Sequence, residues 1–555
     1  MKITVNDIVI EIHNGARVKD AVFKYYSDQG EKLPKAMPVV EDKFGNILDE
    51  EGRLMEDSTL FITNKKRRRS WFRGLSALIF TAIVLFGCST GRKAVTVPST
   101  ERQAVIFAVN DIHATIDNFP KLAFIADSLR TLYPDMLLVA AGDNQTGNPV
   151  NDQYPEKGWP VIELMNSTGF DLSAVGNHEF DSSPEGFARI TRKAGFEFIC
   201  ANVSVTGAID IRLKPFRIIN LPNGLRLAFL GLLHINQNGI PDSHPDNVKG
   251  FEFRQPLEAA PDYMYLKEQS DIFIALTHIG FENDVKLAET MPAGLDLIIG
   301  GHSHTRVEKD QIHNGIMITQ AENKLKYGTL IKLTVKSDGS VQRSQELIDI
   351  RNSKNEKPSV RALVDRFNDN PVLNEVIAEA SDDFSSYEEL GYLMADAQRD
   401  AAKADIALVN PGGVRIDRLP RGPVTIKNVY QLDPFGNELI VTDLTGAEIH
   451  GLMMSAFDVD DKSALYPSGV KTSHKLDTNG ALAEVSVFTP DGNPFEMNRT
   501  YSVAMNSYMT SVYKYEHKDP GKSLFITTAD ALIAYLRKNP DLRSYRGEKR
   551  IVVTK

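Results

Sequence analysis

Five short apolar runs, each followed at once by a cluster of polar residues, constrain the fold of this chain more than any other feature. The runs are residues 104–109, 136–140, 172–175, 272–276 and 295–299. Short runs rich in Val, Ile, Leu and Ala are typical of buried strands in a parallel sheet. The carboxyl ends of such strands meet at one sheet edge, which is where open α/β sheets bind their ligands. The sequence therefore predicts an α/β fold with one polar site at that edge.

The polar residues that follow these runs are of the types that bind divalent metals. They are Asp111-Ile-His113, Gly142-Asp143-Asn144, Gly176-Asn177-His178-Glu-Phe-Asp181, Thr277-His278 and Gly300-Gly-His302-Ser-His304. Carboxylate, imidazole and amide oxygen without a thiolate suit Zn, Mn or Fe, and such a set can hold two ions. Two ions within about 4 Å of each other share a bridging carboxylate. Asp143 is the natural bridge, because it stands alone between the other clusters.

Each motif alone has an ordinary interpretation, since a single histidine after a strand is usually a core or surface residue. Together, in this order and rough spacing, the five motifs resemble the calcineurin-like metallophosphoesterases. The resemblance implies an αββα sandwich over residues 103–350 that binds two divalent ions, Zn, Mn or similar. It implies that one ion is held by Asp111, His113, Asp143 and His304, and the other by Asp143, Asn177, His278 and His302. It also implies that His178 is the catalytic acid and that Asp181 orients it.

Composition narrows the class of protein further. A chain of 555 residues is long enough for three or four domains. The net charge of −10 argues against a nucleic-acid partner, and no obligate protein partner is evident. The two cysteines, Cys88 and Cys200, provide no disulfide framework, and Cys200 lies in a strand-like run that predicts a buried, unreactive thiol. Three further histidines have no motif around them, and we interpret them as ordinary: His234, His244 and His313.

Residues 1–63 resemble small β-grasp domains. Two β-rich runs, 3–5 and 8–12, flank Asn6-Asp7 and predict a hairpin. A helix is expected over 18–26, followed by short strands at 38–40, 45–48 and 60–62. No catalytic residue stands out here, so we expect a binding or regulatory module.

Residues 64–102 have the pattern of a signal segment or membrane anchor followed by a tether. A basic run at 65–69 precedes an uncharged apolar run at 75–87, which is too short for a comfortable membrane span. The sequence Leu85-Phe-Gly-Cys88 resembles a bacterial lipobox, which implies lipidation at Cys88. An uncleaved anchor with its basic side in the cytoplasm is the alternative. Either way, we expect a membrane-anchored protein of the bacterial cell envelope whose catalytic part faces the periplasm or the exterior.

A folded segment ahead of a signal is unusual, and two explanations stay open. Residues 1–63 remain in the cytoplasm, or translation starts at Met55.

Residues 351–371 are expected to form a linker with a helix over 359–368, and residues 372–555 a mixed α/β substrate-binding domain. A helix over 390–403 leads into a strand at 405–410 and then into Pro411-Gly-Gly-Val-Arg415. Glycines after a strand allow a ligand to approach the backbone, and a nearby arginine can bind phosphate with two hydrogen bonds.

This region resembles the carboxyl-terminal domain of bacterial 5′-nucleotidases and UDP-sugar hydrolases. The resemblance implies that Arg415 binds the substrate phosphate, that Phe435 and Tyr508 stack on the base, and that Asn437 hydrogen-bonds to it. Asn410, Gly412 and Gly413 complete the expected binding residues.

The sequence departs from that family in two places. Family members usually carry Gly-Gly-Asp-Gly just after the second aromatic residue, where this chain has residues 509–516, Met-Thr-Ser-Val-Tyr-Lys-Tyr-Glu. Many also carry an arginine before the first helix of the domain, where this chain has Asp382-Asp-Phe-Ser-Ser-Tyr387. Phosphoester hydrolysis is therefore a firmer prediction than nucleotide specificity.

We expect an exported two-metal phosphohydrolase that acts on 5′-nucleotides or nucleotide sugars. Alternatives on the same scaffold are a cyclic-nucleotide phosphodiesterase and a sulfur-ester hydrolase. An alternative of another class is a surface binding protein whose metal centre is vestigial.

Overall fold

The computed structural model describes residues 1–34, 36–63, 101–236, 238–243, 245–291, 294–369, 371–459, 463–477 and 481–554. The expected signal segment, with Cys88 and the apolar run 75–87, lies outside these residues. Among the helices of the described part, none is both long and apolar enough to cross a membrane.

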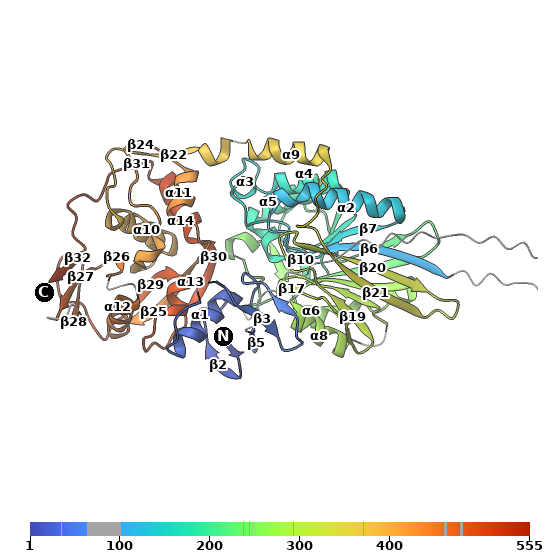
Figure 1. The fold of residues 1–555 in the computed structure, drawn as a ribbon, viewed down its shortest axis with the longest axis horizontal. Helices are drawn as coiled ribbons and strands as arrows, with labels where there is room; N and C mark the ends of the chain where they lie inside the picture. Colours follow the sequence, from blue (N-terminus) through green and yellow to red (C-terminus); the bar gives the residue numbers. More distant parts are fainter. Residues whose placement is uncertain are drawn as a thin grey trace, which may run out of the picture.

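Two sheets packed face to face form the centre of the larger lobe (Figure 1). In spatial order the first is β11 (Leu213–Lys214), β9 (Glu197–Ile199), β8 (Leu172–Ala174), β7 (Leu137–Ala140), β6 (Arg102–Val109), β20 (Tyr327–Val335) and β21 (Val341–Asp349). The second is β12 (Phe216–Asn220), β13 (Arg226–Leu233), β15 (Ile272–His278), β16 (Leu297–Ile299), β19 (Ile316–Thr319) and β18 (Gln311–His313). Strands β9, β8, β7 and β6 run parallel, as do β13, β15, β16 and β19.

Alternation along the strands explains why both faces of each sheet are apolar. Ile106 of β6 packs between the sheets with Phe229 and Ile274 of the second sheet. Its neighbour Phe107 points the other way, into the core beneath the helices. Helices α2 (Phe119–Leu132), α4 (Trp159–Thr168), α5 (Ser183–Lys193) and α9 (Pro358–Asn368) cover the first sheet, and α8 (Phe281–Thr290) covers the second. The predicted α/β fold is confirmed, with the two sheets between layers of helix.

The sequence pattern of residues 255–269 predicts one continuous helix, and this prediction is wrong. Instead of a continuous helix, residues 256–269 form three short pieces, α6 (Pro256–Ala259), the 3₁₀ turn η4 (Ala260–Tyr263) and α7 (Leu266–Gln269). Pro261 lies in the middle of this stretch, and a proline there has no backbone N–H to continue the helical hydrogen bonds.

The amino-terminal domain, residues 1–63, is a sheet with one helix across it. Its strands are β1 (Lys2–Val5), β2 (Ile8–Glu11), β3 (Val39–Asp42), β4 (Ile47–Leu48) and β5 (Thr59–Thr63), and its helix is α1 (Val18–Asp28). The β1–β2 hairpin turns at Asn6 and Asp7, both with positive φ, as a tight two-residue turn requires. A sixth strand comes from the larger lobe, because β17 (Thr305–Arg306) pairs with β4.

The smaller lobe is built from residues 376–554. Its main sheet has the order β26 (Tyr466–Ser468), β23 (Ile406–Val409), β29 (Thr500–Asn506), β25 (Glu438–Thr445) and β30 (Lys522–Thr527). A second sheet has the order β24 (Gly422–Thr425), β22 (Val376–Ala380) and β31 (Asp541–Leu542). A third has the order β28 (Leu482–Phe488), β27 (Lys471–Leu476) and β32 (Ile551–Thr554). Its helices are α10 (Tyr387–Ala402), α11 (Ile426–Leu432), α12 (Gly446–Val459), α13 (Ser507–Val512) and α14 (Thr528–Lys538).

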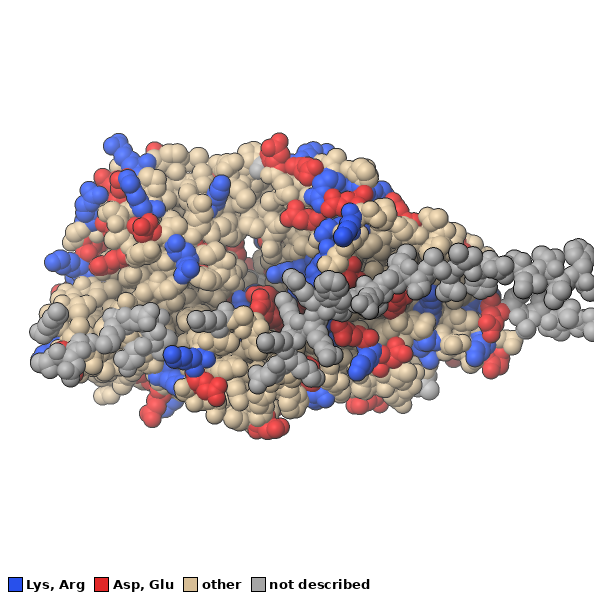
Figure 2. Space-filling view, viewed as in Figure 1, with Lys and Arg blue, Asp and Glu red and all other residues tan. Residues whose placement is uncertain are grey.

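The amino-terminal domain lies between the two lobes and contacts both (Figure 1). On the face shown in Figure 2, acidic and basic side chains are interspersed rather than gathered in large patches of one sign.

The core between the two sheets yields the first prediction. Phe229 is fully buried there, so Phe229→Ala should destabilise the larger lobe by about 3–5 kcal/mol through lost apolar contact and a cavity. Urea unfolding followed by the fluorescence of Trp159, in a Trp71→Phe background, measures the change. Ile312 lies in the same sheet but is 63% exposed. Ile312→Ala should therefore change stability by less than about 0.5 kcal/mol, and a similar loss in both variants would contradict the assignment.

Candidate metal centre

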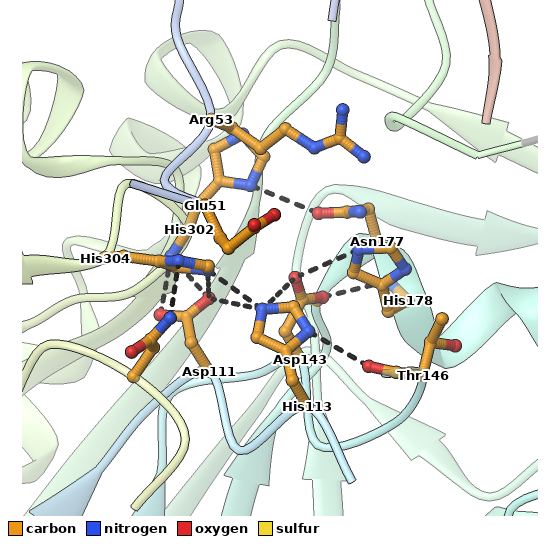
Figure 3. A network of polar contacts seen from close by, with 12 residues as sticks. Glu51, Arg53, Asp111, His113, Asp143, Thr146, Asn177, His178, His302 and His304 are labelled. Atoms are coloured by element: carbon orange, nitrogen blue, oxygen red, sulfur yellow. Dashed lines mark hydrogen bonds and ion pairs between the residues drawn. The ribbon is translucent and has the colours of Figure 1, made fainter. Parts of the chain in front are cut away.

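The side chains expected as metal ligands gather at the carboxyl edge of the parallel strands. Asp111 and His113 follow β6, Asp143 follows β7, Asn177 and His178 follow β8, His278 ends β15, and His302 and His304 follow β16. Figure 3 shows most of them converging on one small volume. The expected ligands Asp111, His113, Asp143, Asn177, His278, His302 and His304 are all at most 8% exposed.

The first expected ligand group has donor atoms at distances suited to one shared ion. His304 Nε2 lies 2.8 Å from His113 Nε2 and 3.4 Å from Asp111 Oδ1. His113 Nε2 lies 3.9 Å from Asp143 Oδ2. Atoms that bind one zinc-like ion at about 2.1 Å lie roughly 3–4 Å from one another. His113 Nδ1 contacts the Thr146 carbonyl at 3.1 Å, which places the ring proton there and leaves Nε2 as a lone-pair donor.

The second group is oriented in the same way by backbone carbonyls. His278 Nδ1 contacts the Ala141 carbonyl at 2.7 Å, so Nε2 presents its lone pair 3.1 Å from Asp143 Oδ2. Asn177 donates its amide N–H to the Asp242 carbonyl at 3.0 Å, which turns Oδ1 toward His302 Nδ1, 3.1 Å away.

These contacts test whether the residues fit a metal. His278 Nε2 is buried and has no hydrogen-bond partner in the described structure, and it faces a carboxylate. The lone pairs of His278 Nε2 and of the Asp143 carboxylate repel each other unless positive charge lies between them. Burial opposes a charged ring, but Asp143 and Asp111 outweigh it and raise the pKa of His278 to about 10. The site therefore attracts positive charge strongly, and the donor set fits divalent cations.

The backbone at this edge is strained. Five expected ligands have positive φ: Asp111 (50°), His113 (45°), Asp143 (50°), His302 (82°) and His304 (53°). Such conformations cost about 1–3 kcal/mol each and cluster at functional sites. Hydrogen bonds hold them, because the Asp111 carboxylate accepts the His302 N–H at 3.0 Å and Asp143 Oδ1 accepts the His178 N–H at 2.9 Å.

Glu179 is a structural residue of the site that sequence reasoning missed. Its buried carboxylate accepts the N–H groups of Asp143 at 3.0 Å, Asn144 at 2.8 Å and Gly176 at 2.6 Å. Burial and the nearby Asp143 carboxylate raise the pKa of Glu179 to about 7. A Cβ on Gly176 would lie 2.2 Å from Asp143 Oδ1, so only glycine allows the two loops this close. The position of Glu179 within the Gly-Asn-His-Glu motif was the signal that could have identified it.

His178 and Asp181 form the expected pair beside the ligands. His178 Nδ1 lies 2.6 Å from Asp181 Oδ2, which also accepts the Thr146 hydroxyl at 2.9 Å. Ser243 donates its hydroxyl to the other carboxylate oxygen at 3.1 Å. His178 Nε2 is thereby directed toward the cluster, 4.0 Å from Asp143 Oδ2. Burial opposes the charged ring, but Asp143 and Asp181 outweigh it and raise the pKa of His178.

Of the three histidines interpreted as ordinary, His234 lies beside the site. Its ring centroid is 4.9 Å from that of His302, and His302 Nε2 lies 3.8 Å from Asp242 Oδ2. These residues belong to a loop that only folding brings to His302. His313 contacts Phe44 at the amino-terminal domain, away from the cluster, and His244 lies outside the described residues.

The expected substrate residues occupy the smaller lobe. The Arg415 guanidinium lies 5.4 Å from the ring centroid of Phe435, and both side chains are exposed. Asn437 and Tyr508 are half-buried. Asn410 is buried and accepts the Asn506 amide N–H at 2.9 Å, while Gly412 and Gly413 form the turn η6 (Pro411–Gly413) after β23.

The amino-terminal domain covers the cluster. Figure 3 shows Glu51 and Arg53 above the expected ligands, with the Glu51 carboxylate directed toward them. Glu51 is paired with Arg17 and, at 3.0 Å, with Lys19. Sequence reasoning assigned no site residue to this domain.

Comparisons with known proteins agree with this architecture. Residues 104–306 match the family model described as calcineurin-like phosphoesterase, and residues 374–513 match that of the 5′-nucleotidase C-terminal domain. The chain is 27% identical over 476 residues to Endonuclease YhcR of Bacillus subtilis, covering 76% of this chain but only 38% of that protein. It is also 27% identical over 476 residues to Protein UshA of Escherichia coli, covering 73% and 84%. The structure of Haemophilus influenzae NAD nucleotidase matches with a TM-score of 0.64 and 17% identity over 82% of this chain and 100% of that one.

The fold and the site together define a metal-dependent phosphoester hydrolase. Residues 104–306 and 374–513 thus match a calcineurin-like phosphoesterase domain followed by a 5′-nucleotidase C-terminal domain.

The His178–Asp181 pair yields the second prediction. A general acid must be protonated, so activity should fall as the pH rises through the pKa of His178, which the two carboxylates raise above its ordinary value. Asp181→Asn removes one of them, so the alkaline limb of the kcat profile should move to lower pH. Ser243→Ala keeps the carboxylate and should leave the limb in place. An unchanged limb in Asp181→Asn would contradict the role of His178 as the acid.

Proposed function

We propose that this chain is a two-metal phosphohydrolase whose preferred substrates are 5′-nucleotides or nucleotide sugars. The observation that carries the proposal is the pair of donor groups that share Asp143, with lone pairs of His113, His278 and His304 directed into one buried volume. Asp111, His113, Asp143 and His304 would hold one ion, and Asp143, Asn177, His278 and His302 the other.

Divalent cations bound there would polarise the phosphate and acidify water for in-line attack. The chain's own residues supply the remaining functions. His178, protonated and held by Asp181, gives its proton to the leaving oxygen from Nε2. Asp181 is itself held by the Thr146 and Ser243 hydroxyls, so the ring has one orientation. Glu179 fixes the loops that carry Asp143 and Asn177 through their backbone N–H groups.

Binding of the leaving group is the proposed role of the smaller lobe. Arg415 and the exposed ring of Phe435 lie next to each other, which suits a phosphate and a stacked base. Asn410, Gly412, Gly413, Asn437 and Tyr508 belong to the same proposed site. Two of the relatives' printed names, 5′-nucleotidase and Endonuclease YhcR, fit phosphoester substrates. The similarity to a protein named as an endonuclease supports phosphodiesters as a second candidate substrate class for this chain.

Membrane attachment through Cys88 or the run 75–87, with the catalytic part in the cell envelope, is part of the proposal. Two forms of it conflict with the structure. Residues 1–63 contact both lobes, so they and the catalytic residues lie on the same side of any membrane. This argues against an anchor that crosses the membrane and leaves residues 1–63 in the cytoplasm, and against a cleavage before Cys88 that separates residues 1–63 from the lobes.

The test is hydrolysis of AMP, UDP-glucose, 2′,3′-cyclic AMP and an aryl phosphate by the purified full chain with added Mn²⁺, with substrate consumed and products formed followed by chromatography. Preference for AMP or UDP-glucose supports the proposal, and preference for the cyclic nucleotide supports the phosphodiesterase alternative. Asp143→Asn should abolish turnover and lower metal content, because one carboxylate serves both ions. No hydrolysis and no bound metal in the unsubstituted protein would point to a binding protein.

A further prediction concerns the base. Phe435 is 43% exposed, so Phe435→Leu should leave folding intact. Loss of stacking should cost about 1–3 kcal/mol of binding free energy and thereby raise KM for AMP. Hydrolysis of the aryl phosphate, which has no base, should stay unchanged. Tyr387, which is 48% exposed in the same lobe, provides the control Tyr387→Leu. An equal effect on both substrates would contradict a role for Phe435 in base binding.

A further inference from the structure

The amino-terminal domain packs against the segment where the sequence departs from its family. Residues 509–516 replace the expected glycine-rich stretch, and they lie in and after α13. Ser27 donates its hydroxyl to the Val512 carbonyl at 2.6 Å, and His13 Nδ1 contacts the Thr510 hydroxyl at 3.1 Å. Phe23 lies edge-on to Tyr508, with ring centroids 6.0 Å apart. The altered segment is therefore a contact surface for residues 1–63.

A buried ion cluster joins the same domain to the smaller lobe. Glu438 is 5% exposed and pairs with Arg53 and, at 3.1 Å, with Arg17. Its other oxygen accepts the Ser523 hydroxyl. Buried charges are tolerated only when they are paired, so separating the domain would leave Glu438 uncompensated.

The amino-terminal domain also contacts the larger lobe. Its loop at residues 49–53 lies against the loop that carries His302 and His304. A Cβ on Gly52 would lie 2.4 Å from the Ser303 carbonyl oxygen, so this contact needs glycine. The Asp49 N–H faces the His304 carbonyl at 3.4 Å, and β4 pairs with β17 directly after His304.

Asp49 itself faces the imidazole of His304. Asp49 Oδ1 lies 3.8 Å from His304 Nδ1. Asn323 donates an amide N–H to Asp49 Oδ1 at 3.0 Å, and the same amide nitrogen lies 2.9 Å from His304 Nδ1. Lys326 holds the other Asp49 oxygen. Asp49 therefore holds the Asn323 amide against the Nδ1 side of the His304 ring, and its negative charge favours a proton on Nδ1, as ligation through Nε2 requires. Among the described residues, Asp49 is the carboxylate that comes within 4 Å of His304 Nδ1.

We propose that Asp49 is a positioning residue of the metal centre, so that the amino-terminal domain is a working part of the site. The inference rests on the proposed role of His304 as a ligand. It assigns residues 1–63, which neither family model covers, to orienting one ligand of one ion. The effect should be specific to that ion, because Asp49 contacts no ligand of the second group in the described structure.

The experiment is a Mn²⁺ titration of the metal-free full chain, followed by electron paramagnetic resonance, with intact mass confirming that residues 1–63 are present. The unsubstituted protein should bind two ions. In Asp49→Asn, affinity for one ion should fall about 10–100-fold while the other is unchanged. Asp7 is exposed in the β1–β2 turn of the same domain, and Asp7→Asn, with the same loss of charge, should bind both ions normally.

A second variant separates position from charge. Gly52→Ala pushes the loop away from Ser303 without changing any charge, so it should weaken the same ion. Asp49→Glu keeps the carboxylate and should restore part of the affinity. Normal binding of both ions in Asp49→Asn and in Gly52→Ala would overturn the inference while leaving the proposed function intact. An unsubstituted protein that binds no Mn²⁺ would instead overturn the proposed function.

Discussion

The structure depends on one electrostatic constraint: carboxylates and imidazole lone pairs meet in a volume from which water is largely excluded. Asp111 and Asp143 lie within 4 Å of ring nitrogens whose protons are directed outward to backbone carbonyls. Such an arrangement is stable only with positive charge between the donors. The positive φ values at Asp111, Asp143 and the histidines follow from it, because the chain must turn sharply to aim short side chains at one point.

The parallel strands make this convergence possible. Strands β6, β7 and β8 of one sheet and β15 and β16 of the other end at the same edge, and an expected ligand lies at the end of each strand or within a few residues after it. Apolar burial on both faces of each sheet provides a rigid support for a strained edge. The apolar packing of the two sheets thus offsets the backbone strain in the loops that carry the expected ligands.

The amino-terminal domain connects the metal centre with the smaller lobe. It pairs with β17 beside His304, and its arginines compensate Glu438. One domain therefore contacts both the candidate metal centre and the lobe proposed to bind the leaving group. Any change in the relative position of the lobes has to alter these contacts.

The sequence by itself determined the α/β class and the identity of the candidate ligands, because strand-forming runs and metal-binding side chains are local patterns. It also predicted the β1–β2 hairpin from Asn6-Asp7. It could not predict the break at Pro261 within a helical pattern, or the buried Glu179, whose partners are backbone groups of other loops. Only the tertiary structure placed Asp49 beside His304, because the two residues are 255 positions apart in the sequence and long-range contacts leave no periodic signal in it.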